Sequence, residues 1–485
     1  MITELQALSK PVERPARVAL TPYIRTLGLL STFGFFLAGI SAVPAPVQAA
    51  GSPNIVFILA DDQGWHQAGC YGSHFYVTPN IDRLAAEGMR FTSAYAACQV
   101  CSPTRASIMT GKYPARLHIT NFIPGSAEKF VDSRLLVPAW QKSLPLEEVT
   151  IAEALKNKGY STGHFGKWHL NIDKKYKPGR PGDPASQGFD DVLTTHKPGA
   201  GPKSKYEDDA HHVREITERA LTFIKANRSK PFFCYVTHNS IHRPITERPE
   251  LVAKYQARAD SSRPDQNPVV GAMMDTLDRS VGRILDQLDA LNLSDNTLVI
   301  YYSDNGCMWG SDVLKPLRGG KAQMWEGGIR VPFIVRWPGV VEPGSVCDVP
   351  VTSVDMFPTL LDAAGEKPSF PNVDGESLLP LLSRSGELTR SAIYWHYPHY
   401  HHQGGFPSGA IRRGHFKLIE WFDKSIDGIE TPGALQLFDL QQDISEQHDL
   451  SEIEPDLTDD LYQELRKWRA VVGAQTMPRR VTEAR

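Results

Sequence analysis

The chain has 485 residues, of which 41% are hydrophobic and 22% are charged, and its formal net charge at pH 7 is −3. This composition is that of an ordinary globular protein, and the length predicts two packed units rather than a single core. A mildly acidic chain has no general electrostatic attraction for nucleic acid, so we expect no nucleic-acid partner.

Residues 1–49 are predicted to be a signal peptide. Basic side chains precede an uncharged stretch at 26–40 that is rich in Leu, Phe, Gly and Ala, and Val47-Gln48-Ala49 has the small-residue pattern of a cleavage site. The apolar stretch is about 15 residues long, against the ~20 needed to span a bilayer, so we expect no stable membrane span. The protein is therefore predicted to be exported, to the periplasm or the extracellular space.

Apolar runs of strand length alternate with helical patterns in residues 50–380, the first predicted domain. Strands are predicted at 54–60, 232–236 and 297–302, and helices at 81–88, 214–226 and 273–291. Buried strands that alternate with helices predict an α/β fold, in which helices cover both faces of a mostly parallel sheet.

Oxygen-bearing side chains follow two of these strands. Asp61 and Asp62 come directly after the first strand, and Asp304 and Asn305 follow the strand at 297–302. Because ligands of open α/β sheets bind beyond the carboxyl ends of the strands, the two pairs could converge. Such a hard oxygen set selects Ca²⁺ or Mg²⁺ over Zn²⁺. Taken alone, each pair is also typical of a turn at a strand end.

A cysteine pair precedes a predicted helix start. Cys98 and Cys101 could form a redox pair or half of a zinc site, but a thioredoxin-like unit would be a much smaller domain, and no second Cys-x-x-Cys completes a zinc site. Pro103 suits a first helical turn, so Cys101 is expected at a helix N-terminus, where unpaired amides favour an anion such as sulfate. In an oxidising compartment, one or two disulfides remain possible among Cys70, Cys98, Cys234, Cys307 and Cys347.

Cationic side chains occur in three later loops. Lys167 and His169 close the segment 159–169, His242 precedes Arg243-Pro244, and Lys321 ends a Leu-Arg-Gly-Gly-Lys run. A single lysine or histidine in a loop is most often solvated or a satisfied buried imidazole. Fixed cations are nevertheless the main way to stabilise a transition state that carries negative charge.

The pattern changes after about residue 380. Short strands predicted at 392–397, 410–421 and 435–440 precede a helix at 457–472, which predicts a smaller α+β domain at 381–485. Residues 395–402 read Trp-His-Tyr-Pro-His-Tyr-His-His, and Arg412 follows shortly after. This segment is rich in aromatic and hydrogen-bonding side chains, although a solvated histidine loop or adventitious metal binding would give the same pattern.

Together these motifs resemble the sulfatase family, the formylglycine-dependent type I sulfatases of the alkaline phosphatase superfamily. The resemblance rests on Cys-Ser-Pro-Thr-Arg at 101–105 and on Gly-Tyr-Ser-Thr and Gly-Lys-Trp-His within 159–169, and it extends over roughly residues 54–450. It implies an alkaline-phosphatase-like α/β domain followed by a small antiparallel sheet with a helix. It also implies a sulfuric ester hydrolase that releases inorganic sulfate from sulfate monoesters.

The resemblance implies a role for each matching residue. A formylglycine-generating enzyme would oxidise Cys101 to formylglycine (3-oxoalanine), whose hydrated aldehyde attacks the sulfur with Asp304 as the base. Arg105 would orient this group, and His242 or Lys321 would protonate the leaving alcohol. His169 would then remove a proton from the second hydroxyl of the hydrated aldehyde, and this removal expels sulfate. Lys167 would complete the cationic sulfate pocket. The implied ligands of a single Ca²⁺, or of Mg²⁺ in its place, are Asp61, Asp62, Asp304, Asn305 and the residue-101 side chain.

The substrate expected from the resemblance is a sulfated small molecule or a sulfated carbohydrate. Because the C-terminal unit of the family often borders the pocket, His396, His399 and Arg412 are predicted to contact the leaving group. Two alternatives stay open. One is a phosphate or phosphonate monoester hydrolase of the same superfamily, and the other is a non-catalytic glycan-binding protein with an unmodified Cys101.

Overall fold

The computed structural model describes residues 52–125, 130, 133–172, 179–260, 262–308, 316–366 and 370–481. The predicted signal peptide at 1–49 lies outside these residues. Residues 46–485 fall into one compact unit, so the predicted domain boundary at residue 380 stays a prediction. Within the described residues, every helix is too short or too polar to cross a membrane.

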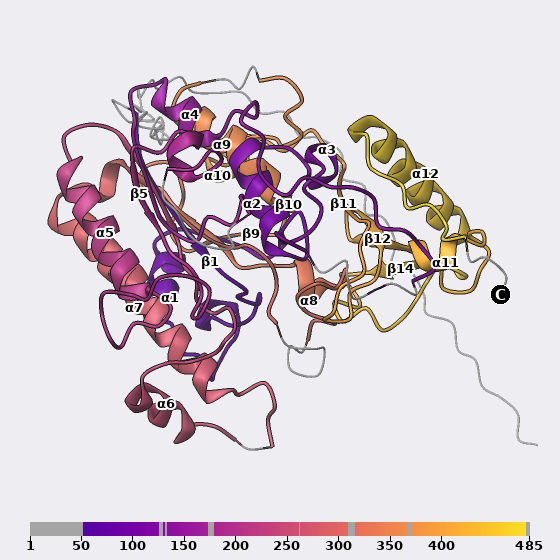
Figure 1. The fold of residues 1–485 in the computed structure, drawn as a ribbon, viewed down its shortest axis with the longest axis horizontal. Helices are drawn as coiled ribbons and strands as arrows, with labels where there is room; N and C mark the ends of the chain where they lie inside the picture. Colours follow the sequence, from indigo (N-terminus) through magenta and orange to yellow (C-terminus); the bar gives the residue numbers. More distant parts are fainter. Residues whose placement is uncertain are drawn as a thin grey trace, which may run out of the picture. The chain divides into compact units, whose positions relative to one another are not determined.

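The central element is a mixed sheet of eight strands (Figure 1). Its strands are β1 (Asn54–Ala60), β2 (Met89–Phe91), β4 (Ser161–Gly166), β5 (Asp191–Thr194), β6 (Phe232–Thr237), β7 (Thr297–Ser303), β8 (Phe333–Arg336) and β9 (Ser345–Cys347). Their order is β5-β4-β6-β1-β7-β8-β2-β9, and all neighbours from β5 to β7 run parallel. Only β8 runs against its neighbours, β7 and β2. The predicted, mostly parallel sheet is confirmed.

Helices cover both faces of this sheet because its central strand is apolar on both sides. In β1, Ile55, Phe57 and Leu59 pack into one apolar cluster, whereas Val56 and Ile58 pack into the other. The first face is covered by α2 (Cys101–Thr110), α4 (Ile151–Lys156), α9 (Met356–Ala363) and α10 (Leu379–Leu382). The second is covered by α1 (Pro79–Ala86), α5 (Val213–Ala226), α6 (Pro249–Gln256) and α7 (Pro268–Ala290), on the opposite side in Figure 1.

A second, antiparallel sheet of four strands follows in the chain. It consists of β11 (Ala392–Tyr397), β12 (Ser408–Arg413), β13 (Phe416–Trp421) and β14 (Leu435–Asp439), and α12 (Pro455–Val472) packs against it. The prediction of one strand at 410–421 is wrong, because this stretch is a hairpin. Gly414 at its turn has a φ of 61°, a left-handed conformation that glycine adopts without strain. The predicted C-terminal antiparallel sheet with a helix is confirmed.

Short elements connect these layers. They are β3 (Ala94–Tyr95) paired with β10 (Val351–Thr352), the helical turns α3 (Pro114–Leu117), α8 (Glu326–Ile329) and α11 (Phe422–Ser425), and 3₁₀ turns at Gly69–Tyr71, Pro184–Gln187, Ser294–Asn296 and Ser353–Asp355. Side-chain hydrogen bonds fix where some helices begin, as where Thr150 and Glu153 form a reciprocal capping box before α4.

Cys98 and Cys101 are not joined by a disulfide, which leaves Cys101 available for other chemistry.

Candidate active site

The parallel strands bring the predicted site residues to one edge of the main sheet. Strand β1 lies between β6 and β7, and Ala60 pairs with Ser303 in β7. Asp61 and Asp304 are therefore the first residues beyond two adjacent strand ends. On the other side of β6, Gly166 of β4 pairs with Thr237, so Lys167 begins a loop beside the one that follows β6. This register is why residues far apart in the sequence converge.

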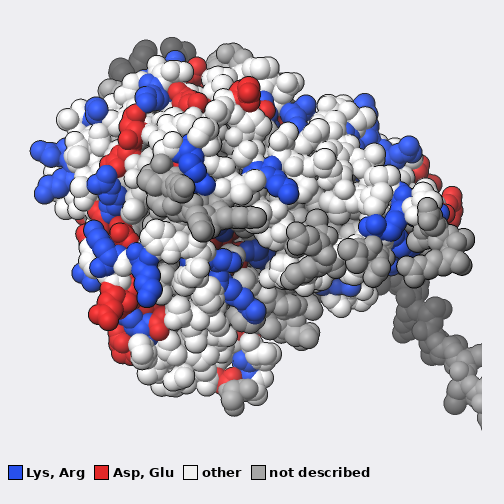
Figure 2. Space-filling model, in the orientation of Figure 1, with Lys and Arg blue, Asp and Glu red and all other residues white. Residues whose placement is uncertain are grey.

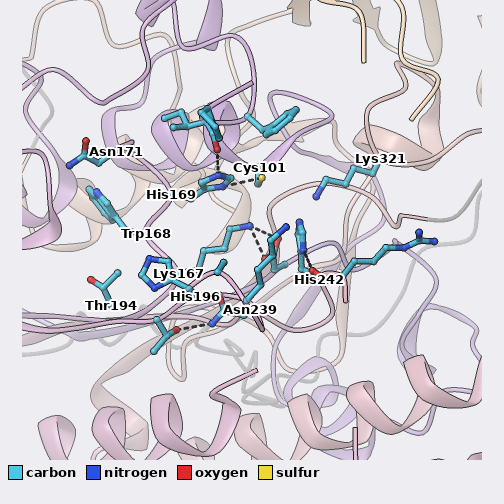
Figure 3. Close-up of a pocket in the computed structure, with 18 of the residues that line it drawn as sticks. Cys101, Lys167, Trp168, His169, Asn171, Thr194, His196, Asn239, His242 and Lys321 are labelled. Carbon is cyan, nitrogen blue, oxygen red and sulfur yellow. Dashed lines mark hydrogen bonds and ion pairs between the residues drawn. The ribbon is translucent and has the colours of Figure 1, made fainter. Parts of the chain in front are cut away.

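A cavity of about 680 Å³ opens at this edge (Figure 3). Cys101, the first residue of α2, faces it from one side, and Lys167, His242 and Lys321 lie across from it. The cavity is also lined by Asp61 and His169, whereas Arg105, Asp62, Asp304 and Asn305 are buried behind its surface. The structure thus gathers the predicted catalytic and metal-binding residues in one place. Their individual roles stay predictions.

Cys101 is buried at the expected helix N-terminus. Its Sγ lies 3.2 Å from Nδ1 of His169. Burial raises the pKa of the thiol, although the nearby charges of Lys167 and Lys321 act in the opposite direction. Because the thiolate is the nucleophilic form of cysteine, the unmodified side chain is a poor nucleophile here. This agrees with a side chain that must be oxidised before it can react.

Hydrogen bonding fixes the tautomer of His169. Its Nε2 lies 2.7 Å from the carbonyl oxygen of Ile123, and a carbonyl can only accept, so Nε2 carries the proton. Burial and the charge of Lys167 hold the pKa of His169 well below 6.5, so the ring is neutral near pH 7. Its Nδ1 therefore presents a lone pair to the group at position 101. His169 can accept a proton there.

Arg105 and Asp304 form a buried ion pair behind the cavity. Nε and Nη2 of Arg105 each lie 2.8 Å from Oδ2 of Asp304, and Nη1 donates to the carbonyl oxygen of Lys167 at 2.7 Å. Oδ1 of Asp304 accepts from the backbone N–H of Asp62 at 3.2 Å. Arg105 thus fixes the two loops that carry Asp304 and Lys167. Its predicted role of orienting the formylglycine stays a prediction.

The donor atoms of Asp61, Asp62 and His242 form a cluster that fits a cation. One ligand atom from each residue lies within 4.8 Å of the others. Oδ2 of Asp62 is buried without a hydrogen-bond partner among the described residues, and it lies 3.8 Å from Nε2 of His242. Nδ1 of His242 lies 2.6 Å from the carbonyl oxygen of Arg243 and so carries the ring's proton.

This arrangement leaves two acceptors facing each other. Burial and the charge of Lys321 hold the pKa of His242 well below 6.5, so its neutral ring turns the Nε2 lone pair toward the Asp62 oxygen. A positive charge between the two atoms would satisfy both of them. The chemistry of these donors, two carboxylates and an imidazole, therefore fits a divalent metal ion.

The rest of the predicted ligand set is only partly arranged for metal binding. Oδ1 of Asn305 is a buried acceptor without a hydrogen-bond partner among the described residues, and its Nδ2 donates to Asp62 at 2.8 Å. Asp304 is turned toward Arg105 instead. Lys167 contacts both oxygens of Asp61 at 2.7 and 2.8 Å, and Lys321 lies 2.5 Å from Asp62, so each carboxylate already has one cationic neighbour. Ligation by Cys101, Asp304 and Asn305 and the identity of the ion stay predictions.

The predicted leaving-group contacts need correction, because His396, His399 and Arg412 do not line this cavity. Nε2 of His396 lies 2.8 Å from the carbonyl oxygen of Gln475, beside a separate hollow under α12. His399 is 1% exposed and lies 2.8 Å from Thr120 Oγ1. Arg412 contacts the hydroxyl of Tyr95. All three side chains are buried and contact other parts of the chain.

Other residues of the cavity were not predicted from the sequence. His401 and His402 belong to the same histidine-rich segment and do line the cavity, as do Phe122 and Lys197. None of these four is part of a family motif. Only the aromatic and histidine content of residues 395–402 pointed toward this region, and which of the histidines reach the cavity depends on the loop between β11 and β12.

Charges on the face shown in Figure 2 are mixed. Lys and Arg side chains gather around its central hollow, whereas many of the Asp and Glu side chains lie toward the margins. The chain as a whole carries a net charge of −3. An anionic substrate would therefore be attracted by a local group of cations and not by the charge of the whole protein.

Comparisons with known proteins agree with this site. A family model described as Sulfatase matches residues 53–366, and one described as N-sulphoglucosamine sulphohydrolase, C-terminal, matches residues 320–470. A Sulfatase of Formosa agariphila is 28% identical, covering 94% of this chain and 96% of that protein, and Arylsulfatase A of Homo sapiens is 32% identical, covering 78% and 76%.

Solved structures show the same fold. The crystal structure of Ps i-CgsB superimposes with a TM-score of 0.71 at 29% identity, covering 86% of this chain and 93% of that one. A second structure of that protein, in complex with k-i-k-neocarrahexaose, gives a TM-score of 0.70 at 28% identity, covering 86% and 93%. The fold and site define a hydrolase of the alkaline phosphatase superfamily. The chain belongs to the sulfatase family and hydrolyses sulfate esters.

Proposed function

We propose that this sulfatase removes sulfate from a sulfated carbohydrate. The observation that carries the proposal is the cavity, whose volume of about 680 Å³ is within the range of pockets that hold a whole small molecule. Phe122, His401 and His402 line it next to one another and are called here the aromatic wall. The rings of Phe122 and His401 lie 5.2 Å apart, and His401 stacks on His402 at 4.4 Å. Such a wall offers flat faces for a sugar ring and nitrogens for its hydroxyls.

A relative supports a carbohydrate substrate. The Ps i-CgsB protein, which shares 28% of its residues with this chain in the superposition, has been solved with k-i-k-neocarrahexaose bound. That ligand is a property of the relative. For this chain, the sugar and the position of its sulfate are not fixed by the likeness.

The chain's own residues prepare the site for an attack on sulfur. When present, the formylglycine would supply a hydrated aldehyde as nucleophile at position 101, and Ca²⁺ or Mg²⁺ held by Asp61, Asp62 and Asn305 would polarise the sulfate. Lys167 and Lys321, on the cavity surface, would bind the sulfate oxygens. His169 would accept a proton through Nδ1 at position 101. Lys321 would give a proton to the leaving alcohol, because the neutral ring of His242, the other predicted donor, turns the lone pair of its Nε2 toward Asp62.

The cellular setting belongs to the same proposal. Export is supported by the charge and hydropathy pattern of residues 1–49. Oxidation of Cys101 is supported by the motif at 101–105, and it would require a formylglycine-generating enzyme as a maturation partner. Cell fractionation of the natural host, followed by detection of the chain with an antibody, tests export directly.

The substrate is tested by a screen of sulfated sugars. Purified chain carrying formylglycine is incubated with sulfated monosaccharides and oligosaccharides, and released inorganic sulfate is measured. We expect at least one sugar to give a kcat/KM well above that of a simple aryl sulfate, because a sugar offers hydroxyl groups to the histidines of the aromatic wall and a simple aryl ring does not. Activity on the aryl sulfate together with no activity on any sugar would contradict a carbohydrate substrate while leaving the sulfatase activity intact.

A further inference from the structure

Lys197 is a cation of the cavity that the sulfate chemistry does not use. It follows β5 and lines the same cavity as Cys101. Burial, followed by the charges of Lys167 and Lys321, lowers the pKa of Lys197, so Lys197 lies close enough to both lysines to feel their positive charge. Lys197 is also reached by solvent, as the outer part of a binding cavity must be.

The three lysines differ in their counter-charges. Lys167 forms an ion pair with Asp61, and Lys321 forms an ion pair with Asp62. Lys197 makes no ion pair with any carboxylate in the part of the chain that the structure describes, a set that includes every other residue lining the cavity. A lysine near two others and without a counter-charge raises the positive potential of the cavity at a cost in stability, which an anionic ligand would offset.

That anion is a different one from the sulfate being removed. The transferred sulfate must lie at Cys101, within reach of Lys167 and Lys321. These two lysines and the metal ion would neutralise its negative charge. Lys197 follows the strand at the outer edge of the sheet, β5, beside Thr194 and His196, which Figure 3 shows on the side of the cavity away from Lys321. A group bound by Lys197 therefore belongs to the part of the substrate that leaves.

We propose that Lys197 forms a subsite for a second anionic group, a carboxylate or another sulfate, on the leaving sugar. The inference rests on the proposed carbohydrate substrate and narrows it to sugars that carry at least two negative charges. The aromatic wall would hold the sugar ring, and Lys197 would select the charge beside it. The substrate class is thus an acidic, multiply charged glycan and not a neutral sugar with one sulfate.

Matched substrates test this subsite. Three sugars share the same scissile sulfate and carry, in addition, no charge, a second sulfate, or a uronate carboxylate on the adjoining ring. We expect kcat/KM of the native chain to be roughly tenfold higher for at least one doubly charged sugar than for the singly charged one, which corresponds to about 1.4 kcal/mol. Which arm gains identifies the anion. The gain should shrink as salt rises from 50 to 500 mM.

Two variants separate Lys197 from general charge effects. Lys197→Met should bring the ratio of the two kcat/KM values close to one, whereas Lys203→Met, which removes an exposed lysine outside the cavity, should leave the ratio unchanged. Melting temperatures of both variants show whether they fold. An unchanged ratio in Lys197→Met would overturn the proposal, as would a native chain that does not distinguish the sugars.

A pair of aryl sulfates keeps this test independent of the carbohydrate proposal. One compound carries a ring carboxylate placed to reach Lys197, and the other lacks it. If no sugar is hydrolysed but the carboxylated aryl sulfate is preferred, and Lys197→Met abolishes the preference, the subsite exists and the carbohydrate assignment fails. No preference within either pair of substrates refutes the subsite.

Discussion

At the scale of single residues, Lys321 and Asp62 lie 2.5 Å apart but are expected to have different roles. Asp62 supplies a buried acceptor to the cation cluster, whereas Lys321 faces the cavity. Lys321→Ala should therefore keep its metal and lose roughly 10²–10³ in kcat, the usual cost of removing one group that stabilises transition-state charge. Asp62→Ala should lose metal and activity together. Metal content after dialysis and initial rates distinguish them, and loss of metal from both variants would contradict this division.

The protonation state of His169 determines how activity should depend on pH. Because its folded-state pKa lies well below 6.5, the ring remains a neutral base as the pH falls through 6.5. The profile of kcat against pH should show no loss of activity near pH 6.5 that depends on His169. His169→Ala should lower kcat by roughly 10²–10⁴, the usual contribution of a positioned proton acceptor. An inflection near pH 6.5 that disappears in this variant would show that the ring titrates normally.

At the scale of elements, the loop that carries Lys321 is held by a buried charge network. Nζ of Lys417, in β13, donates to Glu326 at 3.0 Å, to Glu446 at 2.8 Å and to the carbonyl oxygen of Met324 at 2.8 Å. The side chains of Lys417, Glu326 and Glu446 are all 0% exposed. The C-terminal sheet thereby anchors the segment just after Lys321, which links the second sheet to the chemistry at the first.

Removing this lysine should be costly. Lys417→Met leaves two buried carboxylates without their shared cation, and we expect the free energy of unfolding to fall by about 3–5 kcal/mol. Lys424→Met, at an exposed position of α11, should change it by less than about 0.5 kcal/mol. Denaturant titration of the two variants beside the native chain measures the difference. Equal stabilities would mean that the network contributes nothing to holding the loop.

The elements also show what the sequence can and cannot predict. Asp61 and Asp304 could be placed together because parallel strands end at a common edge, a general property of the fold. His396 could not be separated from His401, because the path of the loop after β11 depends on contacts with distant residues such as Gln475 and Phe122. The hairpin at 408–421 was predicted as one strand, because its turn is only two residues long. Lys197 lies in no motif, and its position emerges only from the folded cavity.

At the scale of the whole molecule, buried histidines should make the protein sensitive to acid. Burial is the largest cause that lowers the pKa of His164, His238, His396 and His399, each to about 3. The unfolded chain binds these protons near pH 6.5, whereas the folded chain does not until about pH 3. Their contribution to stability is therefore complete above pH 6.5 and is lost as the pH falls from 6.5 toward 3.

This loss can be measured. At pH 5 each such histidine should cost about 2 kcal/mol relative to neutral pH. Melting temperature should fall steadily below pH 6.5, and His238→Asn, which removes one titrating ring bonded to Ser280, should make the fall less steep. A melting temperature that is constant between pH 6.5 and 4.5 would contradict the assignment of these rings as buried and neutral.

The central claim is that this chain hydrolyses sulfate esters through an oxidised Cys101, and one measurement tests it most directly. The chain is produced with and without a formylglycine-generating enzyme, the mass of the peptide bearing residue 101 is determined, and sulfate release is measured on the same samples. We predict that activity rises in proportion to the fraction of peptide in the aldehyde form and is absent from chain that holds only the thiol. Full activity in a sample whose residue 101 is entirely cysteine would contradict the account.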